Sequence, residues 1–149
     1  MNVTLPEPTP RSVRERRDRF LAATRLLEHH SEPPDGDLND WLVDLHQALA
    51  VVDEMLAVHI AQTEAEQGFL DELVGESAGR LQASVNELRA DHGRLHKATR
   101  ELLSQVEEEP HPEALRAAAR DLVQQLDDHY RRGADLLWEA YGVDLGTPG

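Results

Sequence analysis

Apolar side chains recur at alternating intervals of three and four residues through most of this chain, and glycine and proline interrupt the pattern at three places. This period is typical of amphipathic helices packed in a bundle. It predicts four helices: residues 10–30, residues 39–74, a third that follows Gly79 and includes 81–106, and residues 112–141. Short connections between four helices predict an all-α fold, an antiparallel up-down-up-down four-helix bundle.

The bundle is expected to occupy residues 10–142, between a flexible N-terminal segment, 1–9, and a C-terminal tail, 143–149. Proline suits the first position of a helix, and both the first and the fourth predicted helices begin with one, Pro10 and Pro112. A chain of 149 residues is long enough for one domain with its own core.

Composition excludes several classes of function. The chain has no cysteine, which removes disulfides, thiolate metal sites and cysteine nucleophiles. Its net charge of −14 argues against nucleic-acid binding and against anionic membranes. No apolar run is long enough to span a membrane and no secretory signal is recognisable, so a cytoplasmic protein is expected. Serine-triad, P-loop and dinucleotide-binding signatures are absent.

Three histidines lie on the apolar seams of the second, third and fourth predicted helices: His59, His92 and His129. Residues on neighbouring antiparallel helices lie level when their midpoint falls in the connecting turn. The midpoint of His59 and His92 falls between residues 75 and 76, and that of His92 and His129 falls between residues 110 and 111. Glycine and proline predict turns at both places, so we expect the three imidazoles to meet at one level of the core.

A metal ion would account for such a layer. Each buried polar group without a partner costs about 1–3 kcal/mol, whereas one ion supplies a partner to all three imidazoles. Imidazole is a ligand of iron, zinc, copper and nickel. The alternative is a layer of histidines joined by hydrogen bonds and water.

Three further side chains are candidate ligands. His96 lies one turn after His92 on the same helix face. Glu66 lies on the seam of His59, two turns further on, and Glu64 lies on its flank. The two carboxylates either swing toward the ion or belong to a solvated acidic face. The predicted metal ligands are therefore His59, Glu64, Glu66, His92, His96 and His129.

The first predicted helix offers no ligand at this level. With its turn centred near residue 34, the position level with His59 is about residue 9, at the very start of the helix. Neither Thr9, Pro10 nor Arg11 is a metal ligand. We therefore expect a site enclosed on three sides and capped or left open on the fourth.

Three level histidines in a four-helix bundle, with the HxxxH pair at residues 92–96, resemble the hemerythrin-like family, also called HHE cation-binding proteins. The resemblance covers residues from about 11 to 142. It implies a non-haem di-iron site that binds oxygen or serves sensing, redox or iron-handling roles. His59 matches the histidine of the family's second helix, His92 and His96 match the pair on the third, and His129 matches the histidine on the fourth.

The carboxylates of the family pattern are missing or displaced here. Thr63 stands four residues after His59, where the family has glutamate. Gly133 stands about a turn after His129, where the family has aspartate or glutamate. The nearest acids lie beyond the expected positions, at Glu64 and Asp135. We therefore expect an altered site that holds one metal ion or an asymmetric pair, in place of an intact di-iron centre.

The sequence thus predicts a hemerythrin-like, non-haem metal-binding protein, with one or two iron ions as its cofactor. A site with open coordination positions binds dioxygen, nitric oxide or peroxide, or activates water. No residue pattern identifies a substrate, so the sequence does not assign turnover.

Two other functions fit the sequence. The bundle could be a metal-free interaction or assembly module, with aromatic residues near the helix ends as its contact points or as caps of the core: Trp41, Trp138 and Tyr141. Alternatively, two of the histidines could hold a haem, for which Gly133 would leave room. The sequence assigns no oligomeric state.

Arginines are concentrated at the start of the first predicted helix: Arg11, Arg14, Arg16, Arg17 and Arg19. In a chain that is otherwise strongly acidic, this cluster either binds an acidic partner or pairs with the protein's own acidic helices.

Overall fold

The computed structural model describes residues 10–33, 36–74, 79–108 and 110–141, except for the side chains at 10, 13, 65–74, 79–81, 137 and 139–141. The predicted N-terminal segment 1–9 and the tail 143–149 lie outside the described residues. Four helices make up the described fold: α1 (Pro10–His30), α2 (Leu38–Val74), α3 (Gly79–Glu108) and α4 (Pro112–Tyr141). No strand occurs in these ranges, so the predicted all-α fold is confirmed.

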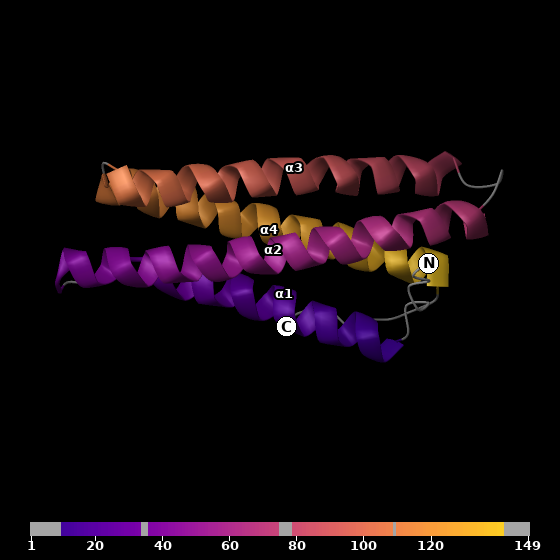
Figure 1. Ribbon diagram of the computed structural model, residues 1–149, viewed down its shortest axis with the longest axis horizontal. Helices are drawn as coiled ribbons and strands as arrows, with labels where there is room; N and C mark the ends of the chain where they lie inside the picture. The colour runs from indigo at the N-terminus through magenta and orange to yellow at the C-terminus, as the bar shows by residue number, and fades with distance from the viewer. Residues whose placement is uncertain (1–9, 34–35, 75–78, 109, 142–149) are drawn as a thin grey trace, which may run out of the picture.

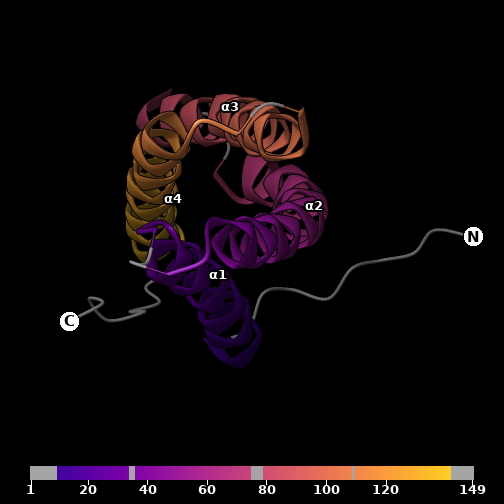
Figure 2. The ribbon, with the colours of Figure 1, turned by 90° about the vertical axis from the view of Figure 1, so that its left-hand side faces the viewer.

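Each helix packs against the helices that precede and follow it in the chain, and α1 also packs against α4. The helices run side by side along the long axis of the molecule (Figure 1), and the view along that axis shows them arranged in a ring (Figure 2). Successive helices run in opposite directions, as the short connections predict. The architecture is therefore an antiparallel four-helix bundle.

The ends of the helices agree with the turn residues of the sequence. The Asp37 side chain accepts a hydrogen bond of 2.8 Å from the backbone N–H of Asn39, and it thereby caps α2. At the other end of the same connection, the Trp41 indole N–H donates to the backbone carbonyl of His30 at 2.9 Å. Trp41 is only 2% exposed, so it caps the core rather than offering a contact surface.

The predicted seams form the core. In α2, for example, Leu45, Leu49, Val52 and Leu56 are fully buried. The polar seam residues Thr24 and Thr99 are also buried, and each satisfies its hydroxyl by donating to the carbonyl four residues earlier. A continuous apolar core therefore runs along the bundle and holds the four helices in register.

No helix in the described part of the chain combines the length and the apolar character that a membrane crossing requires.

Candidate metal centre

Three imidazole rings form a compact triangle in the bundle core. His59 comes from α2, His92 from α3 and His129 from α4. The ring centroids lie 5.3 Å apart for His59 and His92, 5.3 Å for His59 and His129, and 5.0 Å for His92 and His129. One nitrogen from each ring can be chosen so that all three lie within 4.8 Å of one another. The three histidines that the sequence placed at one level thus meet, and together they could hold a metal ion.

A layer of leucines fixes the height of the triangle. Leu56, Leu95 and Leu126 each lie three residues from one of the histidines, on the same helix, and none is more than 2% exposed. Because α2 and α4 run opposite to α3, these leucines share one level next to the imidazoles. Close packing of this layer keeps the histidine backbones from shifting along the bundle.

His129 is held by a buried carboxylate from the neighbouring helix. Its Nδ1 lies 3.0 Å from Oδ2 of Asp91, and neither residue is more than 4% exposed. An ionised carboxylate only accepts hydrogen bonds, so Nδ1 of His129 carries the proton and donates it. Nε2 of His129 is then left with a lone pair that points toward the other two histidines. A carboxylate that orients a histidine in this way is the usual outer partner of a metal-binding imidazole.

Two arginines keep Asp91 ionised in this buried position. Arg132 lies 2.6 Å from Oδ2, and Arg94 pairs with Oδ1. Burial alone would raise the pKa of Asp91, but the hydrogen bonds from His129 and Arg94 and the charge of Arg132 together lower it below its ordinary value. The carboxylate is therefore present as an acceptor at neutral pH.

The contact between His59 and His129 has the spacing of two ligands of one ion. Their Nε2 atoms lie 3.1 Å apart. Two nitrogens that bind one tetrahedral ion at about 2.0–2.1 Å lie about 3.3 Å apart. Without an ion, His59 donates its Nε2 proton to the lone pair of His129. With an ion, His59 must carry its proton on Nδ1 instead, so the pair can adopt either state with little movement.

His92 has an unused nitrogen. Its Nδ1 is buried and forms no hydrogen bond with a described residue. Leaving such a nitrogen without a partner costs about 1–3 kcal/mol. A buried, unpaired imidazole nitrogen beside two other imidazoles favours the metal site over a self-sufficient hydrogen-bonded layer.

The site keeps its imidazoles neutral, which is the form that binds metals. Burial lowers the pKa of His59 to about 3, with further lowering from His129, His92 and Arg16. Burial and the neighbouring His129 lower the pKa of His92 to about 4. Burial also lowers the pKa of His129, although Asp91 opposes that shift.

Helix α1 places an aromatic ring against part of the fourth side. The ring centroid of Phe20 lies 5.1 Å from that of His59 and 6.0 Å from that of His129. Among the described residues, the group with metal-ligand spacing consists of His59, His92 and His129 and includes no residue of α1. The prediction that the level of His59 corresponds to about residue 9 is wrong, since Phe20 occupies that level. A midpoint at residue 34 requires the same rise per residue on both sides of it, whereas residues 31–33, 36 and 37 are not helical, and nonhelical residues rise by a different amount per residue.

The remaining predicted ligands lie apart from the triangle or outside the described part. His96 is half-exposed, and its Nδ1 lies 3.8 Å from Oδ1 of Asp53. Glu64 is exposed to solvent. The side chain of Glu66 lies outside the described residues. Of all the described side chains, only the three core histidines form a group with metal-ligand spacing.

Two structural details could have been found in the sequence. Asp91 directly precedes His92, and the midpoint of residues 91 and 129 falls at residue 110, in the predicted turn. Asp91 is therefore also expected level with His129, although it lies off the apolar seam. Thr63, four residues after His59, donates its hydroxyl to the His59 carbonyl at 2.8 Å, so this hydroxyl is used within α2.

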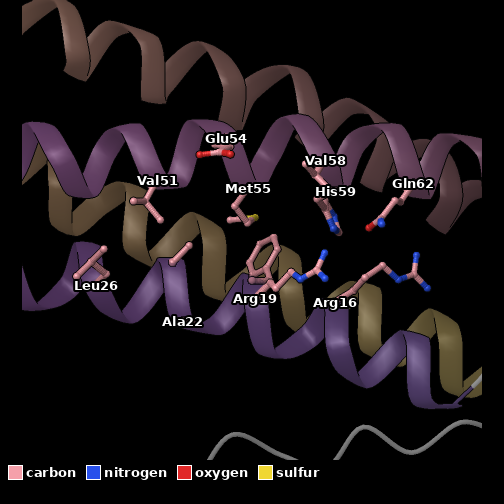
Figure 3. Close-up of a pocket in the computed structure, with 12 residues that line it drawn as sticks. Arg16, Arg19, Ala22, Leu26, Val51, Glu54, Met55, Val58, His59 and Gln62 are labelled. Atoms are coloured by element: carbon pink, nitrogen blue, oxygen red, sulfur yellow. The ribbon is translucent and has the colours of Figure 1, made fainter.

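His59 is the accessible member of the triangle. It lines a groove between α1 and α2 (Figure 3), whereas His92 and His129 are buried. A small molecule or ion would therefore reach the centre from the side of α1.

Comparison of the chain with protein-family models, with curated proteins and with solved structures yields no match.

Proposed function

We propose that this protein binds one iron ion through His59, His92 and His129, as a hemerythrin-like protein with an altered site. The observation that carries the proposal is the triangle of buried imidazoles, with ligand nitrogens within 4.8 Å of one another. The unpaired Nδ1 of His92 supports it, because a bound ion would supply a partner for this buried nitrogen. The three imidazoles alone suit iron, zinc, copper or nickel, and the resemblance to the hemerythrin-like family favours iron.

Three protein ligands leave coordination positions open on the ion. A metal ion held in this way supplies a binding position for dioxygen, nitric oxide or peroxide. The chain itself determines how the site is surrounded. Asp91 orients His129, and Phe20 and the leucine layer keep bulk water from two of its sides. The groove beside His59 leaves a path for a small ligand.

In this proposal, the three histidines of the triangle are the ligands. His96 is not a ligand, so a variant at this position serves as the control. His96 belongs to a separate group with Asp53 and Arg100, where Arg100 lies 3.3 Å from Oδ2 of Asp53. Glu64 and Glu66 stay candidate additional ligands. Binding of a second ion would require one of these carboxylates to turn toward the core.

The test is the metal content of protein purified without chelator and without an affinity-tag metal, measured by mass spectrometry together with the ultraviolet–visible spectrum. We expect about one equivalent of iron per chain, with absorption that changes on addition of reductant or peroxide. His92→Ala should lose the iron, whereas the matched variant His96→Ala should keep it. A wild-type protein that takes up less than about a tenth of an equivalent of any transition metal, even after anaerobic loading, would overturn the proposal.

A second candidate function is a metal-free interaction or assembly module. The exposure of Trp138 favours it, since 55% of this large apolar side chain on α4 is open to solvent. Tyr141, near the same end, lies outside the described side chains. A chain that is fully folded, free of metal and indifferent to added iron, and that loses self-association or partner binding in Trp138→Ser, would establish this function instead.

A further inference from the structure

A groove of about 500 Å³ lies between α1 and α2, on the outside of the bundle. Figure 1 shows the two helices diverging toward the end where α1 begins. Sites for small molecules occupy about 300–1,000 Å³, so the groove has the size of a ligand site rather than of a protein interface.

One end of the groove is cationic. Arg16 and Arg19 extend from α1 toward α2, on the side where His59 and Gln62 lie (Figure 3). The charge of Arg16 reaches His59, whose pKa it helps to lower. Arg19 forms no ion pair with another described residue, in contrast to Arg25, which pairs with Glu28 and Asp127. Two guanidinium groups at the mouth of one groove are notable in a chain of net charge −14.

The other end of the groove is apolar. Ala22 and Leu26 of α1 face Met55 and Val51 of α2 across it (Figure 3). Val51 is 41% exposed and Val58, further along the same wall, is 44% exposed. Aliphatic side chains that stay this exposed along one wall of a groove are suited to cover by an apolar ligand.

We propose that this groove binds a medium-chain carboxylate, with its head group on Arg16 and Arg19 and its hydrocarbon chain along Ala22, Leu26 and Val51. Arginine suits a carboxylate because its planar fork of N–H donors matches the two oxygens. The ten residues from Arg16 to Leu26 rise by about 15 Å along the helix, which is the scale of a medium-length chain. The proposal does not depend on a metal ion at the histidines.

The charges along the groove also determine the orientation of the ligand. Glu54 is exposed on α2 beside the apolar half of the groove. Its carboxylate would repel a negative head group there, whereas the arginine end attracts one. The ligand therefore enters with its carboxylate toward His59 and its chain toward Leu26 (Figure 3).

The test is calorimetric titration of the chelator-treated protein with decanoate, so that binding to a metal ion cannot contribute. We expect one-to-one binding of decanoate and at least tenfold weaker binding of decyltrimethylammonium, which has the same chain and the opposite charge. The double variant Arg16→Gln/Arg19→Gln should raise the Kd for decanoate at least tenfold. Arg14→Gln, an exposed arginine of the same helix outside the groove, should leave the Kd within a factor of two.

A second pair of variants tests the apolar half. Ala22→Trp fills the groove from an exposed position, so it should abolish decanoate binding without disturbing the core. Ala117→Trp, on an exposed face of α4, is its control and should bind decanoate as the wild type does. The proposal is overturned if decanoate does not bind, if the cationic analogue binds equally well, or if the groove variants have no effect. It is also overturned if sedimentation shows a dimer that Ala22→Trp disrupts, because a second copy would then occupy the groove.

Discussion

His129 and Asp91 form a buried hydrogen-bonded pair, with 3.0 Å between Nδ1 and Oδ2, that joins α4 to α3 beside His92. The pair fixes which nitrogen of His129 carries its proton, and it therefore fixes which one faces the other two imidazoles. Asp91 is itself held by arginines from both of these helices, Arg94 and Arg132. The orientation of one ligand thus depends on a small network that reaches the surface.

Removing the carboxylate should weaken metal binding while leaving the ligands in place. We expect Asp91→Asn to lower the affinity for iron about 10–100-fold, the range found when such outer partners are lost. The matched control is Asp53→Asn, which also removes an aspartate beside a histidine and an arginine, but outside the triangle. Competition titration with a chelator of known affinity measures both. Equal affinities for the two variants would show that Asp91 does not orient a ligand.

Replacing His92 should separate stability from metal binding. The unpaired Nδ1 of His92 destabilises the metal-free protein. His92→Leu should therefore raise the free energy of unfolding of the metal-free protein by about 1 kcal/mol. The same variant should no longer retain iron. His129→Leu should instead destabilise the metal-free protein, because Asp91 would lose a hydrogen-bond donor. Denaturant unfolding in the presence of a chelator measures both variants, and destabilisation by His92→Leu would contradict this view of Nδ1.

The metal-free protein should lose stability in mild acid. The pKa of His59 is lowered to about 3 and that of His92 to about 4 in the fold, whereas an unfolded histidine titrates near 6.5. Below this value the unfolded chain binds more protons than the folded one, so stability is full above about pH 6.5 and decreases as the pH falls toward 4. Each of the two histidines contributes a slope of up to about 1.4 kcal/mol per pH unit.

Urea unfolding of the chelator-treated protein at several pH values between 7.5 and 4.5 measures this slope. His59→Gln should reduce it, whereas His96→Gln, at a half-exposed site away from the triangle, should leave it unchanged. A free energy of unfolding that stays constant across this range would mean that the histidines are not buried as neutral groups.

Gly133 can be replaced without affecting the site. A Cβ built at Gly133 would meet nothing within 4 Å, and the same holds for Gly93 in α3. Because both lie inside helices, we expect Gly133→Ala and Gly93→Ala each to stabilise the fold by about 0.5–1 kcal/mol. Thermal unfolding measures the gain, and metal content should stay unchanged. A loss of stability at Gly133 would show that a neighbouring group needs this space.

The helices and the histidine level were predictable because local signals determine them. Glycine and proline mark the turns, and the apolar period identifies the buried faces, so the level of His92 followed from the chain alone. The position of α1 was not predictable in the same way, since it depends on the path of the connection between α1 and α2, in which residues 31–33, 36 and 37 are not helical. This is why Phe20 rather than residue 9 faces His59.

Other features depend on tertiary packing that no periodicity encodes. The level of Asp91 follows from the midpoint of residues 91 and 129, but its ion pairs with Arg94 and Arg132 depend on how α3 and α4 pack. The groove lies between α1 and α2, whose divergence (Figure 1) a heptad pattern does not specify. Packing also places the arginines of the first helix in different environments. Arg11 pairs with Glu15, whereas Arg16 and Arg19 line the groove.

The most direct test of the metal centre is a crystal structure of the iron-loaded protein, with anomalous diffraction recorded on either side of the iron absorption edge. We expect one anomalous peak per chain, about 2.0–2.2 Å from a ring nitrogen of each of His59, His92 and His129. We also expect Asp91 to stay hydrogen-bonded to His129. A peak beside His96 and Asp53, or no peak within the triangle at full iron loading, would contradict the proposed metal centre.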